Sequence, residues 1–170
     1  AEAPCETEVF VFGGLCVMAE GRCSLSSYAT GRSPNMQGVC SPPSHVRYER
    51  QGDQMVSRLG AFTIDRVPHG SPAPYPTLCK GCFVAGPFKG HVFDDPASLD
   101  AATLLAKLAE AGVTAVKIEG RQRSRAYIRA VVEAFRHAID SLARTGTVPP
   151  VALARLSEAN STTTGAYRKA

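Results

Sequence analysis

Residues 101–143 decide the fold of this 170-residue chain, and they read AATLLAKLAEAGVTAVKIEGRQRSRAYIRAVVEAFRHAIDSLA. Leucines recur at helical spacing in the first part of this stretch, namely Leu104, Leu105 and Leu108. This spacing predicts a helix over 101–111, which Gly112 can end. The next six residues, VTAVKI (113–118), form an apolar run that predicts a buried strand.

A second helix is expected after the polar turn EGRQRS (119–124), because Ser124 can cap it. Apolar residues then recur with the period of a helix, at Tyr127, Val131, Phe135, Ala138 and Leu142. They predict a helix over 125–143, and Gly146 follows it. Helix, strand, turn and helix is the order of a βα unit. One unit cannot close a sheet, so we expect an α/β fold that is part of a TIM-like (β/α) barrel, with further strands before residue 1 or from a partner.

The first half of the chain is less regular. VFVF (9–12) predicts one buried strand that ends at Gly13 and Gly14. A long cysteine-bearing insertion follows, rich in loops, with a short helix and short strands expected at 25–29, 46–48 and 61–64. We therefore assign residues 1–150 to the C-terminal half of a barrel-like domain in a longer protein. Residues 151–170 are expected to form a C-terminal tail.

The charge of the chain is unevenly distributed. Hydrophobic residues make up 44% and charged residues 20%, which is ordinary for a globular protein, and no apolar run is long enough for a membrane-spanning helix. Residues 96–170 hold 11 Lys and Arg against 6 Asp and Glu. Six of the basic residues are close together in sequence, namely Lys117, Arg121, Arg123, Arg125, Arg129 and Arg136. They indicate either a binding surface for phosphate, carboxylate or RNA, or a solvated helix face.

Six cysteines are the unusual feature of the composition. No export signal is visible, so we expect a reducing compartment, the cytoplasm, where clustered cysteines more often bind metal than form disulfides. Cys16, Cys23, Cys40 and Cys79 stand in loop-rich sequence, but their spacing matches neither a ferredoxin run nor a zinc ribbon. The pair Cys79 and Cys82, taken alone, is typical of a zinc knuckle or a thioredoxin-like motif. Spacing therefore leaves metal binding, buried thiols and disulfides open.

Several separated blocks resemble a known family. They are EVF (8–10), GGLC (13–16), GRCSLSSY (21–28), GRSPN (31–35), KIEGR (117–121) and AID (138–140). In this order they are similar to the collagenase-type unassigned peptidase family thirty-two. Gly14 is a departure, since the family usually has Ala or Ser there. The family's proteins are about twice as long, so the chain resembles their C-terminal half.

Within the family, the stretches FVFGGLC (10–16), YPTLCKG (75–81) and EGRQRS (119–124) resemble the branch that makes ubiquinone without oxygen. The resemblance implies a [4Fe–4S] cluster held by Cys16, Cys23, Cys40 and Cys79. It also implies a heterodimer with a partner called UbiV, and hydroxylation of the ubiquinone ring precursor with prephenate as the hydroxyl donor. Cys79 is preferred over Cys82 because it lies in the LCKG motif. Cys5 is expected to be a small buried residue, and neither Cys5 nor Cys82 is expected to bind the cluster.

Two residues of the turn at 119–124 are catalytic candidates. Glu119 and Arg121 lie just past the predicted strand, at the edge where α/β barrels place their chemistry. Glu119 is a candidate acid or base, and Arg121, with Arg123 and Arg125, matches the carboxylates of prephenate. The alternative is a Glu–Arg ion pair that fixes the loop.

Three other functions remain open at this point. Hydroxylation of tRNA or ribosomal RNA is the first, because related family members act on RNA and the basic stretch would serve it; small molecules are the preferred substrates. Peptidase activity is the second, although no GxSxG, HExxH or Cys–His–Asn pattern supports it. The third is a non-enzymatic iron–sulfur scaffold.

Overall fold

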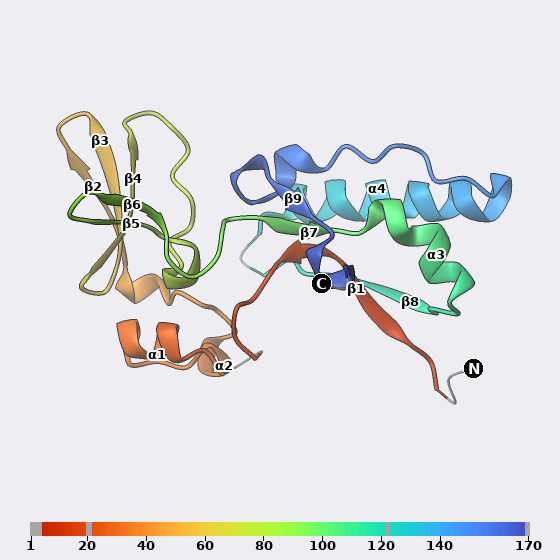
Figure 1. The fold of residues 1–170 in the computed structure, drawn as a ribbon, viewed down its shortest axis with the longest axis horizontal. Coiled ribbons are helices and arrows are strands. Elements are labelled where there is room, and N and C mark those ends of the chain that lie inside the picture. Colours follow the sequence, from red (N-terminus) through yellow and green to blue (C-terminus); the bar gives the residue numbers. More distant parts are fainter. Residues whose placement is uncertain (1–4, 20–21, 122, 169–170) are drawn as a thin grey trace. The chain divides into compact units, whose positions relative to one another are not determined.

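The computed structural model describes residues 5–19, 22–121 and 123–168, which form two compact units. Unit 1 consists of Ala1–Leu15 and Ala97–Ala170, and unit 2 is Cys16–Pro96 (Figure 1). The expected single domain over 1–150 is thus divided, because the chain leaves unit 1 after its first strand and returns to it at residue 97. The cysteine-bearing segment lies in unit 2.

Unit 1 contains a four-stranded mixed sheet in the order β8-β1-β7-β9 (Figure 1). Strand β1 (Glu8–Gly14) pairs in parallel with β8 (Ala115–Ile118), as a βα unit requires. Strand β7 (Ser98–Asp100) is antiparallel to β1, and β9 (Thr162–Thr163) is parallel to β7. Among the described residues this sheet is open, so the barrel stays a prediction. The short strands β7 and β9 have too few residues for a pattern to indicate them.

The two apolar patterns of unit 1, one rich in leucine and one with aromatic residues, each correspond to a helix. Helix α4 (Arg125–Thr145) confirms the second predicted helix, since the Ser124 hydroxyl accepts the Tyr127 N–H at 3.2 Å and Gly146 has a φ of 71°. Helix α3 (Leu105–Glu110) is shorter than predicted because its first turn is a 3-10 helix, η3 (Ala102–Leu104). The Asp100 carboxylate accepts the Ala102 N–H at 3.0 Å and holds this turn.

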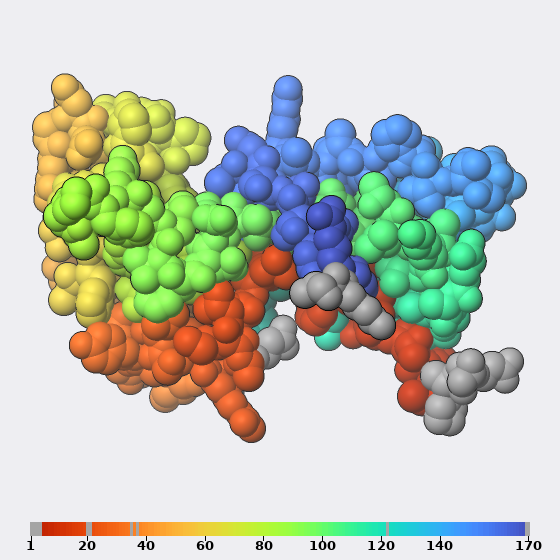
Figure 2. Space-filling model, in the orientation of Figure 1, coloured from red at the N-terminus to blue at the C-terminus, as the bar shows by residue number. Residues whose placement is uncertain are grey.

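One apolar core joins the sheet of unit 1 to its helices. Its buried residues are Val11, Phe12, Ala101, Ala102, Leu105, Val131, Phe135, Ala138 and Leu153. In the space-filling view the atoms of α3 (green) and α4 (blue) lie close together (Figure 2). The predicted tail over 151–170 is not separate from this core. Leu153 is buried in it, and the Tyr167 hydroxyl donates to the Phe10 carbonyl.

The end of the chain adds short elements to unit 1. They are η4 (Ala154–Leu156), η5 (Glu158–Asn160), β9 and η6 (Gly165–Tyr167). Because β9 pairs with β7, this segment extends the sheet.

Unit 2 begins with two short helices and a three-stranded meander. Helix α1 (Ser24–Thr30) confirms the predicted short helix, and α2 (Pro34–Gln37) follows it. Strands β2 (Val46–Gln51), β3 (Gln54–Leu59) and β4 (Phe62–Pro68) are antiparallel neighbours. The sequence predicts β2 and β4 in part but not β3, because polar residues interrupt its apolar pattern.

The rest of unit 2 carries Cys79 and Cys82. A 3-10 turn, η1 (Pro43–His45), precedes β2, and a second, η2 (Leu78–Lys80), precedes the hairpin of β5 (Cys82–Ala85) and β6 (Phe88–His91). The core of unit 2 is small, with Leu59, Ile64 and Leu78 buried. In the described part of the chain, no helix combines the length and apolar character needed to cross a membrane.

Candidate metal centre

Three of the four predicted ligands in unit 2 interact electrostatically. Burial is the main cause that raises the pKa of the Cys79 thiol, and the Cys23 and Cys16 thiols raise it further. The Thr77 hydroxyl and the Lys80 ammonium act in the opposite direction. Thiols influence each other's pKa in this way only at short range, so Cys16, Cys23 and Cys79 share one neighbourhood.

A chain of hydrogen bonds connects the cysteine loops. Cys23 caps α1, with its Sγ accepting the Ser26 N–H at 3.3 Å, and the Ser26 hydroxyl donates to the Cys40 carbonyl. The next residue, Ser41, donates from its hydroxyl to the Pro76 carbonyl at 2.5 Å. Since Pro76 lies three residues before Cys79, these contacts link the loops of Cys23, Cys40 and Cys79.

Two further contacts fix the same loops in unit 2. The Tyr75 hydroxyl donates to the Ser41 carbonyl. The end of α1 lies close to the β3–β4 turn, because a Cβ on Gly60, where φ is +57°, would lie 2.5 Å from the Ala29 carbonyl oxygen. Only glycine fits there, so this close approach helps to position the helix that Cys23 caps.

The four thiols differ in exposure. Cys16 and Cys40 are exposed, whereas Cys23 and Cys79 are half-buried. Within residues 5–19, 22–121 and 123–168, no three His, Cys, Asp or Glu side chains form a ready group that could hold a metal. The structure therefore brings the loops together without closing the thiols into a ligand set.

The donor chemistry of this neighbourhood fits an iron–sulfur cluster. Such clusters are held by cysteine thiolates, and the four residues are all thiols on loops. The hydrogen-bonded serines Ser26 and Ser41 were not among the predicted site residues. Ser26 has a local signal, since it lies three residues after Cys23 at the spacing of a helix cap. Ser41 has none, because its partner is 35 residues away in sequence.

The remaining cysteines lie outside this set. The prediction that Cys5 is buried is wrong, because Cys5 is exposed in the residues that precede β1. Cys82 is half-buried on β5, opposite His91, and its N–H donates to the Asp65 carboxylate at 3.1 Å. Burial raises the pKa of Asp65, and the Cys82 N–H and His91 oppose this rise.

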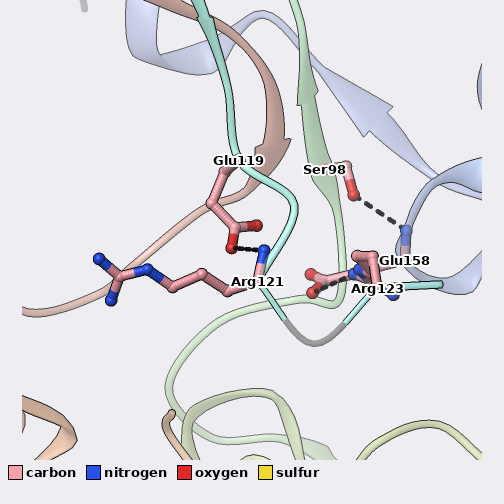
Figure 3. A network of polar contacts seen from close by, with 5 residues as sticks. All are labelled: Ser98, Glu119, Arg121, Arg123 and Glu158. Carbon is pink, nitrogen blue, oxygen red and sulfur yellow. Dashed lines mark hydrogen bonds and ion pairs between the residues drawn. The ribbon is translucent and has the colours of Figure 1, made fainter. Parts of the chain in front are cut away.

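The catalytic candidates Glu119 and Arg121 lie in unit 1, directly after β8 (Figure 3). The Glu119 N–H donates to the Phe12 carbonyl at 2.8 Å, and the Glu119 carboxylate accepts the Arg121 N–H at 2.8 Å. Figure 3 shows the Arg121 guanidinium pointing away from this carboxylate. The expected alternative, an ion pair between these two side chains, is therefore not what fixes the loop.

Arg123 forms the ion pair of this turn, with a partner that the sequence did not indicate. Its guanidinium lies 3.3 Å from the Glu158 carboxylate, and the Ser98 hydroxyl accepts the Glu158 N–H at 3.0 Å (Figure 3). Arg123 also lies 5.2 Å from the centre of the Tyr127 ring. Burial raises the pKa of Tyr127, with Arg123 acting against the rise. Arg123 thus anchors the turn, and a contact across 35 residues has no local sequence signal.

The two glycines at the end of β1 make room for these carboxylates. A Cβ on Gly13 would lie 2.5 Å from the Glu119 Cβ, so no side chain fits there. A Cβ on Gly14 would lie 3.2 Å from a Glu158 carboxylate oxygen and 3.8 Å from one of Glu119. Gly14, the departure from the family pattern, therefore gives Glu158 more space than alanine would.

Most of the basic stretch is neutralised within unit 1. Four of its six residues form ion pairs, namely Lys117 with Glu8, Arg123 with Glu158, Arg129 with Glu133 and Arg136 with Asp140. In the described part of the chain, Arg121 and Arg125 are the members without such a pair. This pattern is closer to a solvated helix face than to a continuous cationic surface.

The described residues combine a mixed sheet and helices in unit 1 with a cysteine-bearing unit 2. A family model described as Peptidase family U32 matches residues 1–168. The chain belongs to this family.

Several curated proteins are similar to the chain. The tRNA hydroxylation protein P of Haemophilus influenzae is 31% identical over 163 residues, covering 81% of this chain and 34% of that protein. The 23S rRNA 5-hydroxycytidine C2501 synthase of Escherichia coli is 27% identical, over 79% of this chain and 16% of that protein. A collagenase of Porphyromonas gingivalis is 24% identical, over 91% of this chain and 30% of that protein. No solved structure matches.

These comparisons place hydroxylating proteins among the relatives of the chain. The chain spans about a third or less of the length of these relatives.

Proposed function

We propose that this chain holds a [4Fe–4S] cluster in a protein that hydroxylates its substrate without oxygen. Cys16, Cys23, Cys40 and Cys79 would be its ligands. The observation that carries this proposal is the hydrogen-bonded connection of their loops through Ser26 and Ser41, together with the influence of the Cys16 and Cys23 thiols on the Cys79 thiol. The names of the relatives support hydroxylation.

The substrate that we propose is the ubiquinone ring precursor, with prephenate as the hydroxyl donor and a UbiV-like partner, as in the UbiU branch of the family. The blocks at 10–16, 75–81 and 119–124 support this assignment. The ion pairing of the basic stretch supports it too, because it leaves few cations for a nucleic-acid backbone.

A bound cluster supplies one-electron redox chemistry. The residues of unit 1 would bind and orient the small molecules. The Arg121 guanidinium is exposed and suits one carboxylate of prephenate, since a guanidinium matches a carboxylate with two hydrogen bonds. Glu119 is held by its bond from the Arg121 N–H and would accept a hydrogen bond or a proton from a hydroxyl group.

RNA hydroxylation is the second candidate, and the relatives favour it. Proteins that are named for hydroxylating tRNA or ribosomal RNA match most of this chain. The same cluster and the same cysteines would serve this reaction.

Peptidase activity is the least supported function. A collagenase is among the relatives, but burial raises the pKa of Cys79, whereas a nucleophilic cysteine needs a lowered pKa.

Iron and sulfide analysis after anaerobic purification tests the cluster. We expect about four iron atoms and four sulfides per chain. Cys16→Ala should lose most of this iron and the visible absorption of the cluster. Cys5→Ala, which alters an exposed cysteine of unit 1, is the matched control and should retain both. A colourless wild-type protein without iron would refute the proposal, and bound zinc would indicate a structural site instead.

Deletion of the gene under anaerobic growth tests the substrate. We expect ubiquinone to be lost while the hydroxylated nucleosides of tRNA and ribosomal RNA remain. The reverse result would replace the quinone by RNA, and a normal content of both would exclude both substrates.

A further inference from the structure

Lys80 is a buried lysine in unit 2, directly after the predicted ligand Cys79. Only 9% of its surface is exposed, and lysine is rarely buried to this degree without a charged or polar partner. Leu78, at the start of the same η2 turn, is 8% exposed, and Cys79 between them is half-buried. Lys80 makes at least one further interaction in the structure. A buried positive charge therefore lies directly after Cys79.

The backbone around Lys80 leaves little freedom. The Lys80 N–H donates to the Thr77 carbonyl at 3.3 Å and closes the turn. A Cβ on Gly81 would lie 2.8 Å from the Phe83 ring and 3.0 Å from Ile64. The chain after Lys80 is thus packed against the core of unit 2, which fixes the backbone next to Lys80.

The charge of Lys80 acts on the cysteine neighbourhood. Its ammonium interacts electrostatically with the Cys79 thiol, so the charge lies close to this predicted ligand. Thiolates and an anionic cluster are costly to bury unless positive charge lies close by. Of the other three predicted ligands, Cys23 has a basic neighbour in the sequence, Arg22, but Arg22 is exposed whereas Lys80 is buried.

We propose that Lys80 is the counter-charge of the iron–sulfur cluster, raising its reduction potential and slowing the loss of iron. This inference rests on the proposed function, since it requires the cluster. A positive charge stabilises the reduced cluster more than the oxidised one, because reduction adds a negative charge. Lys80 acts through the cluster and is a positioning residue rather than a catalytic one.

The test compares four variants of the full-length protein after anaerobic reconstitution. Lys80→Met and Lys80→Gln remove the charge, and Lys80→Arg keeps it. Lys89→Met removes the charge of an exposed lysine in the same unit and is the matched control. The measurements are the midpoint potential of the cluster by redox titration, the rate of iron release to a chelator, and the circular dichroism spectrum.

We expect the neutral Lys80 variants to lower the ratio of reduced to oxidised cluster at least tenfold at a fixed potential, which is about 59 mV for one electron. They should also release iron several times faster. Lys80→Arg and Lys89→Met should stay near the wild type in both measurements.

Three outcomes would overturn the inference about Lys80. The first is that Lys80→Met and Lys80→Gln keep the wild-type potential and iron release. The second is that Lys80→Arg changes as much as the neutral variants, which would assign the effect to packing. The third is that neither neutral variant folds, which would make Lys80 a structural residue. A wild-type protein that binds no cluster would instead refute the proposed function, so the two failures are distinguishable.

Discussion

The two units of this chain are stabilised in different ways. Among the described residues, the apolar core cluster of unit 1 has nine buried residues between a sheet and two helices, whereas that of unit 2 has three. Unit 2 instead connects its loops with buried polar groups, namely Ser26 and Ser41. Apolar burial tolerates small movements, but a buried hydrogen bond requires a particular geometry.

This difference separates stability from positioning. Unit 1 provides a firm base for the turn that carries Glu119 and Arg121. In unit 2, polar contacts bring the cysteine-bearing loops together, because the small apolar core does not hold them by itself. Substitutions in the two units should therefore have different consequences, and four predictions test this contrast.

The largest effect is expected from Phe135→Ala in unit 1. Phe135 is 2% exposed and its ring centre lies 6.1 Å from that of Phe12. Its loss should reduce the free energy of unfolding by about 3–5 kcal/mol. Urea unfolding measures this change, and Val132→Ala, at a half-exposed position of the same helix, is the control. A loss below that of the control would show that this core does not stabilise unit 1.

A smaller effect is expected from Ser41→Ala in unit 2. Ser41 is fully buried, and its removal leaves the Pro76 carbonyl without this hydrogen bond. The free energy of unfolding should fall by about 1–3 kcal/mol. Urea unfolding is again the measurement, joined by the iron content.

The control for Ser41 is Ser44→Ala, which alters an exposed serine in the η1 turn, three residues further along the chain. If Ser41→Ala and Ser44→Ala retain iron equally, the hydrogen bond from Ser41 does not position the cysteine loops.

The pH dependence of stability compares one aspartate from each unit. Burial raises the pKa of Asp65 in unit 2 and of Asp100 in unit 1, and each accepts one backbone N–H. Because each folded pKa lies above the unfolded value of about 3.9, the folded protein binds the proton more tightly. Each contribution to stability is present below the unfolded pKa and is lost as the pH rises through the folded pKa.

Asp65→Asn and Asp100→Asn should each flatten this fall in stability, as measured by urea unfolding between about pH 3 and 7. Asparagine keeps an oxygen that can accept the N–H, so the hydrogen bond survives. Asp53→Asn, in the exposed β2–β3 turn, is the control. An unchanged pH profile in both variants would contradict the raised pKa values.

The smallest effect is expected from Arg136→Gln on α4. Arg136 lies 2.6 Å from Asp140, but both side chains are more than half exposed. The free energy of unfolding should change by about 0.2–1 kcal/mol at low salt, and less at high salt. Arg125→Gln, at a position without an ion pair among the described residues, is the control. A change above 2 kcal/mol would show that surface charge, and not the apolar core, supports unit 1.

The sequence predicts those elements whose residues follow a periodic or continuous apolar pattern. The apolar stripe of α4 and its cap at Ser124 are local signals, and so are the strands β1 and β8. Strands β7 and β9 exist because distant segments pair, so no local pattern indicates them. The division into two units depends on the same long-range pairing.

The sequence predicts the type of the candidate site, but not the residues that position its loops. Four cysteines in loops indicate a metal or cluster, and the resemblance selects them. Ser41, Lys80 and Glu158 act through burial or through contacts far apart in sequence, which composition and spacing do not encode.

The pairing of Gly14 with Ser98 has a consequence for the history of the chain. These residues flank the whole of unit 2, yet they are neighbours across two strands of the same sheet. A tight turn could close this gap, so an ancestor could have gained unit 2, or a descendant could lose it, without rebuilding the sheet. The cysteine-bearing unit is therefore an insertion between two paired strands. Recombination at residues 14 and 98 would transfer all four predicted ligands together.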